Sequence, residues 1–330
     1  MKMVFIKYCS NSAVTEKYLN IIGKMFSDEC VKEFKNAEEV KETDLLIVAT
    51  EIDFLKCYLK GIRNIVYWMQ GITAEESYLK HKSYPRKAVL NQITKFALKK
   101  SKAIFYVSEE MKRFEENKYK IDTSFKSFIM PCFNTDLDES SFSYEKKYAN
   151  NVFAYVGSLS KWQCFSETVD FYKKIENDIK DTKLMVFTSE QELAKEVLEK
   201  KRVKNYSVSF VTPQDMCKAL YPVKFGFVLR DNIEVNRVAT PTKLSSYMAA
   251  GVIPVFSDCL CDFKKKSANM KFAVSVKEKK VPEKLIALIN DKIDTEDISS
   301  EYNNLFKTYY NPDYYIERYA RSLKTICKRK

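Results

Sequence analysis

The sequence predicts an α/β protein with two doubly wound, Rossmann-like parallel sheets. Short apolar runs alternate with segments of helical spacing along most of the chain, which is typical of parallel sheets covered by helices. The alternation stops in a polar stretch at residues 140–150 and then begins again. The clearest unit, at residues 225–256, reads as strand, polar loop, helix and strand, and such a unit implies parallel pairing.

Residues 1–148 form the first predicted domain. Its strands are expected in the short apolar runs at residues 4–8, 45–49, 64–69, 103–107 and 128–130. Helical spacing predicts helices at residues 14–26 and 86–100, and Ser108 is the expected N-cap of a third helix. Neither a Gly-x-Gly-x-x-Gly fingerprint nor a Walker P-loop follows the first strand, which argues against a dehydrogenase and a P-loop nucleotidase.

Residues 149–312 form the second predicted domain, and residues 140–150 are the expected linker. Apolar runs predict strands at residues 152–156, 184–187, 207–211, 225–229, 252–256 and 272–276. Helices are expected at residues 165–175, 190–200, 213–220 and 282–289. A helical tail at residues 302–327 should break at Asn311 and Pro312, so that residues 313–330 form a terminal helix that could cross back to the first domain.

The helix inside residues 225–256 predicts a binding site. Thr240 is the expected N-cap, Pro241 the first helical residue and Gly251 the helix end. Its N-terminus follows the carboxyl end of a strand, where free N–H groups and the helix dipole attract a phosphate. Positive charge nearby comes from Arg230, Arg237 and Lys243. The alternative is an ordinary crossover with solvated basic residues.

Composition narrows the class of protein. The 330 residues are 45% hydrophobic and 30% charged, as in a globular protein, and the net charge of +12 suits an anionic partner. Nine cysteines without metal-ligand spacing and a single histidine, His81, argue against a metal centre or a His-based triad and for a reducing cytoplasm. No apolar run reaches about 20 residues, and the first residues read as a strand instead of a signal peptide.

Residues 77–108 carry many cations and no acidic residue. The cations are Lys80, Lys82, Arg86, Lys87, Lys95, Lys99, Lys100 and Lys102. A helix here could lie on an anionic membrane, with the four lysines Lys95, Lys99, Lys100 and Lys102 at the headgroups and Phe96 or a neighbour at the lipid boundary. The alternative is that these cations form one solvated face of a domain helix. His81 is expected at the surface. Because no nucleic-acid motif is present, a nucleic acid is not expected as a partner.

The second half resembles a known family. Residues 154–162, AYVGSLSKW, are similar to the opening strand and glycine turn of the family 4-like GT-B glycosyltransferases (glycosyltransferases group 1). That family's signature has a Pro-x-Lys helix start, an acidic residue, an aromatic residue, two small residues and Gly. Here the corresponding residues are Pro241, Lys243, Ser246, Tyr247, Ala249, Ala250 and Gly251. Over the first half the resemblance is architectural, apart from residues 130–138, MPCFNTDLD, which resemble the closing strand.

The resemblance implies two Rossmann-like domains that face a central cleft, and a sugar donor that is a nucleotide diphosphate sugar. It implies that the diphosphate lies among the catalytic cations Lys161, Arg237 and Lys243, and that the base lies against residues 210–212. The donor-binding residues it implies are Gly157, Ser158, Phe210, Val211, Thr212, Arg230, Asn236, Thr240, Pro241, Thr242 and Ser246. On the acceptor side it implies Gln70 and Gly71. Without an Asp-x-Asp motif, we expect no metal cofactor, because cations would do the work of Mg²⁺.

The function we expect is therefore a hexosyltransferase that extends a cell-surface or capsular polysaccharide on a glycan or lipid-linked acceptor, at the inner face of the membrane. The chain departs from the family at two positions. Many members carry glutamates that would fall at Val238 and Ser246. Their loss keeps an alternative open, a catalytically silent subunit that binds a nucleotide or a partner transferase. Isolated acids such as Glu51 and Asp53 are more typical of solvated surface than of a catalytic base.

Overall fold

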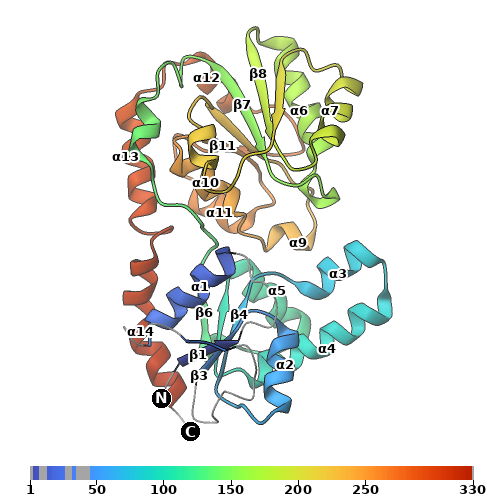
Figure 1. The fold of residues 1–330 in the computed structure, drawn as a ribbon, viewed down its shortest axis with the longest axis vertical. Coiled ribbons are helices and arrows are strands. Elements are labelled where there is room, and N and C mark those ends of the chain that lie inside the picture. Colours follow the sequence, from blue (N-terminus) through green and yellow to red (C-terminus); the bar gives the residue numbers. More distant parts are fainter. Residues whose placement is uncertain (1–2, 7–12, 27–31, 35–44, 329–330) are drawn as a thin grey trace. The chain divides into compact units, whose positions relative to one another are not determined.

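The computed structural model describes residues 3–6, 13–26, 32–34 and 45–328, and divides the chain into two compact units. Unit 1 comprises Met1–Cys132, Arg237–Thr240 and Tyr309–Lys330, and unit 2 comprises Phe133–Asn236 and Pro241–Thr308. Each unit holds one six-stranded parallel sheet with helices packed around it, as the sequence predicts (Figure 1). The division falls after Cys132, and not after residue 148 as predicted.

The sheet of unit 1 has the strand order β2-β1-β3-β4-β5-β6, and every pair is parallel. Its strands are β1 (Met3–Ile6), β2 (Lys32–Phe34), β3 (Leu45–Val48), β4 (Ile65–Met69), β5 (Ala103–Tyr106) and β6 (Ser127–Ile129). All residues of β3, β4 and β5 are buried. Helices on both faces explain why these strands read as continuous apolar runs without polar alternation.

The helices of unit 1 are α1 (Ala13–Lys24), α2 (Glu51–Leu59), α3 (Thr73–His81), α4 (Tyr84–Lys100), α5 (Glu109–Tyr119) and α14 (Pro312–Lys328). Ser108 caps α5 as predicted, because its Oγ accepts a hydrogen bond of 2.9 Å from the Met111 N–H. Helices α2 and α3, which are only nine residues long, are not predicted from the sequence. Thr50 caps α2 by accepting from the Asp53 N–H.

The sheet of unit 2 has the strand order β12-β11-β10-β7-β8-β9, again all parallel. Its strands are β7 (Asn151–Val156), β8 (Thr182–Phe187), β9 (Tyr206–Ser209), β10 (Phe225–Val228), β11 (Ile253–Ser257) and β12 (Val274–Val276). The chain builds the sheet outward from β7 to one side and then from β10 to the other. The strand order therefore reverses between β7 and β10, where α/β sheets bind ligands at the carboxyl ends of the strands.

The helices of unit 2 are α6 (Phe165–Asp178), α7 (Gln191–Lys200), α8 (Met216–Ala219), α10 (Thr242–Ala249), α11 (Cys261–Lys266), α12 (Glu283–Asn290) and α13 (Thr295–Phe306), and α9 (Glu234–Arg237) crosses the boundary of the units. The predicted break at Pro312 is confirmed, because α14 begins there. The helix before it starts at Thr295, earlier than predicted, since the Asp294 carboxylate caps it by accepting from the N–H groups of Glu296 and Asp297.

The predicted linker at residues 140–150 is part of unit 2. Phe142, Lys147 and Tyr148 are 3%, 1% and 8% exposed. The Lys147 ammonium donates to three carbonyl oxygens, those of Leu220, Tyr221 and Ala250, at 3.2, 2.9 and 2.8 Å. These contacts hold the segment on unit 2 and place the boundary at Cys132. Among the described residues, no helix is both long and apolar enough to cross a membrane.

Candidate functional site

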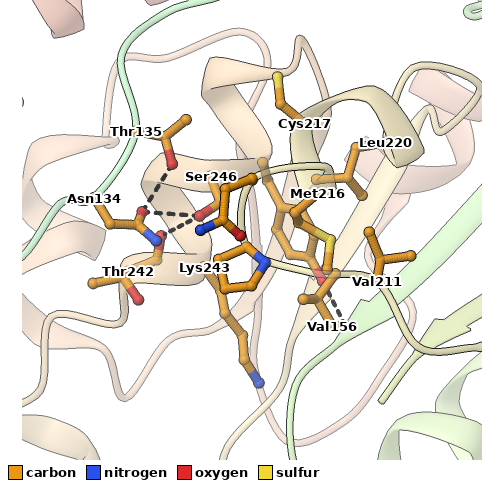
Figure 2. A pocket seen from close by; sticks show the side chains of 13 residues that line it. Asn134, Thr135, Val156, Val211, Met216, Cys217, Leu220, Thr242, Lys243 and Ser246 are labelled. Atoms are coloured by element: carbon orange, nitrogen blue, oxygen red, sulfur yellow. Dashed lines mark hydrogen bonds between the residues drawn. The ribbon is translucent and has the colours of Figure 1, made fainter. Parts of the chain in front are cut away.

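A pocket of about 260 Å³ lies in unit 2 beside the N-terminus of α10 (Figure 2). Its walls come from the segment before β7, from the end of β7, from the segment between β9 and α8, and from α10. The residues that line it are Asn134, Thr135, Val156, Val211, Pro213, Gln214, Met216, Cys217, Leu220, Thr242, Lys243, Ser246 and Tyr247. No acidic side chain is among these lining residues, so the pocket suits a ligand that carries negative charge.

The first turn of α10 faces the pocket without a side-chain cap. The helix begins at Thr242, and Pro241 occupies the N-cap position with extended backbone. The prediction that Thr240 caps the helix is wrong. Its Oγ1 instead accepts a 3.0 Å hydrogen bond from the Cys132 N–H within unit 1. Since no side chain caps α10, the N–H groups of Thr242 and Lys243 face an anion site at the positive end of the helix dipole, while the Leu244 N–H bonds to the Pro241 carbonyl at 3.1 Å.

Tyr247 fixes α10 against the sheet. Its hydroxyl accepts a hydrogen bond of 3.1 Å from the Val156 N–H at the end of β7. Its ring covers Gly226 of β10, where an added Cβ would lie 2.6 Å from the ring carbons. The helix ends as predicted at Gly251, which has φ +65°, and the N–H of the next residue, Val252, bonds back to the Tyr247 carbonyl at 2.9 Å. The position of the pocket wall therefore follows from the strands beneath it.

Two cations meet at one amide oxygen beside the pocket. The Lys243 ammonium donates to Gln163 Oε1 at 2.7 Å, and the Arg230 guanidinium donates to the same oxygen. Arg230 also donates to the carbonyl oxygens of Gln163 and Leu229, at 2.8 and 3.0 Å. It is only 6% exposed, so the alternative of a solvated cation is wrong for this residue. Gln163 was not predicted, because a lone Gln in a turn carries no sequence signal.

Neither cation has a negative partner in the part of the chain that the structure describes; their polar contacts there are to amide and carbonyl oxygens. Burial lowers the pKa of Lys243 well below its ordinary value, and the charge of Arg230 lowers it further. Burial also lowers the pKa of Arg230, although a guanidinium stays charged in proteins. A buried and a half-buried positive group without a counter-charge are unfavourable alone, and an anion beside them would relieve that cost.

Gly157 lets the Lys243 side chain reach this position. It follows β7 with φ +120°, and an added Cβ would lie 2.7 Å from both Cε and Nζ of Lys243. Ser158 is exposed, and its hydroxyl lies 3.1 Å from that of Ser160. Lys161 opens the 3-10 turn that ends at Gln163, but its side chain is exposed. The structure thus brings Gly157, Arg230 and Lys243 together and leaves Lys161 at the edge of the cluster.

A polar group forms the middle of the pocket wall. The side-chain oxygen of Asn134 accepts hydrogen bonds from Ser246 at 2.9 Å and Thr135 at 3.1 Å (Figure 2). It also accepts one from Ser245 at 3.2 Å. Because three hydroxyls surround the oxygen, the Asn134 amide group is held with one orientation. Asn134 was not among the predicted site residues, although it lies in the segment that resembles the family's closing strand.

The other end of the pocket is apolar. Val211, Pro213, Met216 and Leu220 line it. Thr212 is exposed and its hydroxyl donates to the Asp215 carboxylate at 2.7 Å. Phe210 is 58% exposed and does not line the pocket. Of the three residues predicted at the base, only Val211 forms part of this wall.

Other predicted site residues lie elsewhere. Arg237 and Thr240 group with unit 1, so the cluster around Lys243 as described does not include them. Asn236 is 3% exposed and donates to the Asp231 carbonyl at 2.9 Å, which is a structural contact. In unit 1, Gln70 and Gly71 follow β4, and an added Cβ on Gly71 would lie 2.2 Å from a Glu76 carboxylate oxygen.

One expectation for unit 1 was wrong. Glu51 is not a solvated acid, because it is 1% exposed and accepts hydrogen bonds from Tyr67 and Thr73 at 3.3 and 3.2 Å. The ring of Phe96 is half-buried and packs edge-on against Tyr58 of α2, with ring centroids 4.9 Å apart. His81 is exposed, as expected. Among the described residues, no cluster of His, Cys, Asp and Glu could hold a metal ion.

Comparisons with known proteins identify the fold. No protein-family model matches this sequence, and no curated protein sequence matches it. HepE from Anabaena, solved in complex with UDP and glucose, is similar over 98% of this chain and 100% of its own, with a TM-score of 0.70 and 12% identity. A TarM mutant from S. aureus, in complex with fondaparinux, alpha-GlcNAc-glycerol and UDP, has a TM-score of 0.63 and 9% identity. That likeness covers 87% of this chain, which spans 57% of the TarM chain.

A trehalose-phosphate synthase (UDP-forming) from Burkholderia vietnamiensis has a TM-score of 0.63 and 11% identity, over 88% of this chain and 74% of its own. These neighbours are GT-B glycosyltransferases, and the chain has the GT-B fold. At such low identity, the likeness establishes the architecture, and the chemistry must be argued from the residues of this chain.

Proposed function

We propose that the protein is a glycosyltransferase whose pocket in unit 2 binds a nucleoside diphosphate sugar. The observation that carries this proposal is the pair of cations, buried Arg230 and half-buried Lys243, which share Gln163 and lack a carboxylate partner among the described residues. A diphosphate would supply the missing negative charge. As the sugar leaves, charge builds on the diphosphate, and cations already in place would stabilise it in the transition state.

The chemical groups along the pocket wall suggest where the diphosphate, the ribose and the base of the donor would lie. The diphosphate would lie at Lys243 and the open N-terminus of α10, with Gly157 allowing close approach. The ribose would lie at the hydroxyl and amide groups of Ser246 and Asn134, and the base at Val211 and the apolar wall. In support, the HepE and TarM structures both contain UDP. Lys161 and Arg237 stay proposed as further diphosphate ligands.

For the acceptor we propose a glycan or lipid-linked glycan in cell-surface or capsular polysaccharide assembly, with a hexose as the transferred sugar. Glucose in the HepE structure and alpha-GlcNAc-glycerol in the TarM structure favour this class. Gln70 and Gly71, at the carboxyl end of β4, are the proposed acceptor side. A cytoplasmic location fits the seven cysteines of the described chain, all of which are free thiols.

The second candidate is a catalytically silent subunit that binds a nucleotide. It is favoured by the two positions where the family resemblance implies glutamates. Ser246 offers the pocket a hydroxyl, and Val238 is 2% exposed with an apolar side chain. Neither can supply the negative charge of a carboxylate. The two candidates share the donor pocket and differ only in turnover.

Titration calorimetry with UDP, ADP and GDP tests the pocket, and Lys243→Met is the informative variant. Loss of a charged hydrogen bond should weaken diphosphate binding by about 1–3 kcal/mol, while the control Lys200→Met, at an exposed residue of α7, should bind as wild type does. Equal affinities in the two variants would remove Lys243 from the site. Release of UDP from UDP-glucose and UDP-GlcNAc, followed by chromatography, then separates the candidates: binding without turnover points to the silent subunit.

A further inference from the structure

The helices α3 and α4 form a hairpin that extends from the body of unit 1 (Figure 1). We call residues 77–89 the hairpin tip. Lys82 ends α3 in the left-handed conformation, with φ 53°, and Ser83 caps α4 by accepting from the Arg86 N–H. The Arg86 guanidinium donates to Ser77 across the turn at 2.8 Å, and the rings of Tyr78 and Tyr84 lie 4.7 Å apart. These contacts give the turn a defined structure.

Apolar groups are exposed at the tip. Tyr84 is 70% exposed and Val89 is 59% exposed, although both belong to α4, whose other face is buried. Pro85 and Ala88 are exposed beside them. Single exposed apolar residues are common on protein surfaces, but these four lie within one and a half turns of α4. An exposed cluster of this kind marks a surface that contacts something other than water.

The charge around this cluster has one sign. Lys80, Lys82 and Arg86 are exposed, and residues 77–89 contain no acidic residue. The acids of α3, Glu75 and Glu76, lie in its first turn, at the opposite end from the tip. Lys87 is the exception among the cations, because it pairs with Glu75 at 3.4 Å. The three exposed cations therefore surround an apolar cluster without local neutralisation.

We propose that the hairpin tip docks on an anionic lipid bilayer. Tyr84 and Val89 would enter the boundary between headgroups and acyl chains, and Lys80, Lys82 and Arg86 would contact lipid phosphates. An aromatic ring with a polar edge, a branched aliphatic residue and long cationic side chains suit such an interface, because each reaches a different depth. Each cation near an anionic surface contributes on its own, so that three together dominate the binding. This inference does not depend on the donor pocket in unit 2.

Cosedimentation of the full chain with vesicles tests the proposal. Vesicles of phosphatidylcholine alone are compared with vesicles that also contain phosphatidylglycerol, at low and high salt. Binding should require the anionic lipid and weaken as salt screens the attraction. The triple variant Lys80→Gln, Lys82→Gln, Arg86→Gln should bind at least about tenfold more weakly at low salt. The matched control removes the same charge from the exposed lysines of α11, Lys264, Lys265 and Lys266, and should bind within about twofold of wild type.

Tryptophan emission reports whether the apolar cluster enters the lipid. Tyr84→Trp should shift to shorter wavelength when anionic vesicles are added, and Phe125→Trp, at a position of unit 1 that is 71% exposed, should not. If the two triple variants lose binding equally, the attraction is only net charge, and the proposal is wrong. A tip variant that binds like wild type, or an unshifted Tyr84→Trp spectrum on bound protein, overturns it too. UDP affinity, measured on the same variants, should not change, which separates this result from failure of the donor site.

Discussion

Gln163 is the residue on which the candidate site depends most. Its side-chain oxygen accepts from both Arg230 and Lys243, yet it carries no charge and leaves both cations uncompensated. An apoprotein optimised for stability would place a carboxylate there. The neutral amide positions the two cations while it leaves their charge for a ligand.

Gln163→Glu should therefore stabilise the free protein and damage the site. A carboxylate between the two cations should raise the free energy of unfolding by about 1–3 kcal/mol, the contribution of a charged hydrogen bond, as measured by denaturant titration. Because the new charge would compete with the proposed diphosphate for the two cations, UDP affinity should fall at least about tenfold. Gln214→Glu adds the same charge at an exposed position of the pocket wall and should not stabilise the protein.

If Gln163→Glu left both the stability and the UDP affinity as in wild type, the two cations would not need an anion. The proposed donor site would then lose its main support.

At the scale of elements, α5 contributes a buried acid to unit 1. Glu115 is 1% exposed, and one of its carboxylate oxygens has no hydrogen-bond partner among the described residues. Burial raises the pKa of Glu115 to about 8, the nearby acids Glu75 and Glu51 raise it as well, and Lys118 lowers it. The helix therefore packs best when this group is protonated.

The sign of the resulting pH dependence follows from proton binding. Between the ordinary pKa of 4.5 and about 8, the folded protein keeps a proton on Glu115 that the unfolded chain releases. This group's contribution to stability therefore falls as pH rises through that window. Glu115→Gln removes the titration, so its free energy of unfolding should match wild type near pH 4.5 and exceed it by on the order of 2–4 kcal/mol above pH 8.

Denaturant titrations of wild type and variant at several pH values measure this difference. Glu110→Gln on the same helix, where Glu110 pairs with Arg113 at 2.8 Å, is the control for loss of a carboxylate. A difference between Glu115→Gln and wild type that does not change with pH would contradict the assignment.

At the scale of the whole molecule, the chain ends in the unit where it begins. Residues 309–330 belong to unit 1, and α14 contacts α1 and β5 there. Tyr315, Leu323 and Cys327 of this helix are 4%, 0% and 6% exposed. The Tyr319 hydroxyl also donates to the Ile129 carbonyl of β6 at 2.9 Å. The terminal helix thus completes the core of unit 1.

Leu323→Ala should destabilise unit 1 without changing the donor pocket. Loss of a fully buried leucine typically costs about 2–5 kcal/mol, which denaturant or thermal unfolding would show. UDP affinity, measured where the variant is folded, should stay at the wild-type value because the pocket lies in unit 2. Reduced UDP affinity in the folded variant would show that the two units depend on one another for binding. The exposed Arg321 of α14, changed to Ala, is the control.

Local signals in the sequence were enough to predict the fold class and the end of α10. Continuous apolar runs identify strands buried on both faces, and Gly251 and Pro312 mark boundaries because their backbone preferences act locally. Predictions from local sequence were wrong where a contact between distant segments determines the structure. Thr240 bonds to Cys132 instead of capping α10, and Lys147 in the predicted linker is buried by carbonyl groups from two distant segments.

The candidate site depends on long-range packing that a sequence does not show. Gln163, Arg230 and Lys243 lie on three separate segments, and they meet because β7 and β10 are neighbours at the point where the strand order of the sheet reverses. A lone Gln or Asn has no periodicity, and a sequence does not show whether an Arg is solvated or 6% exposed. Burial and the absence of a carboxylate partner within the described chain turn these residues into a site that favours an anion, and both are properties of the packed sheet and helices.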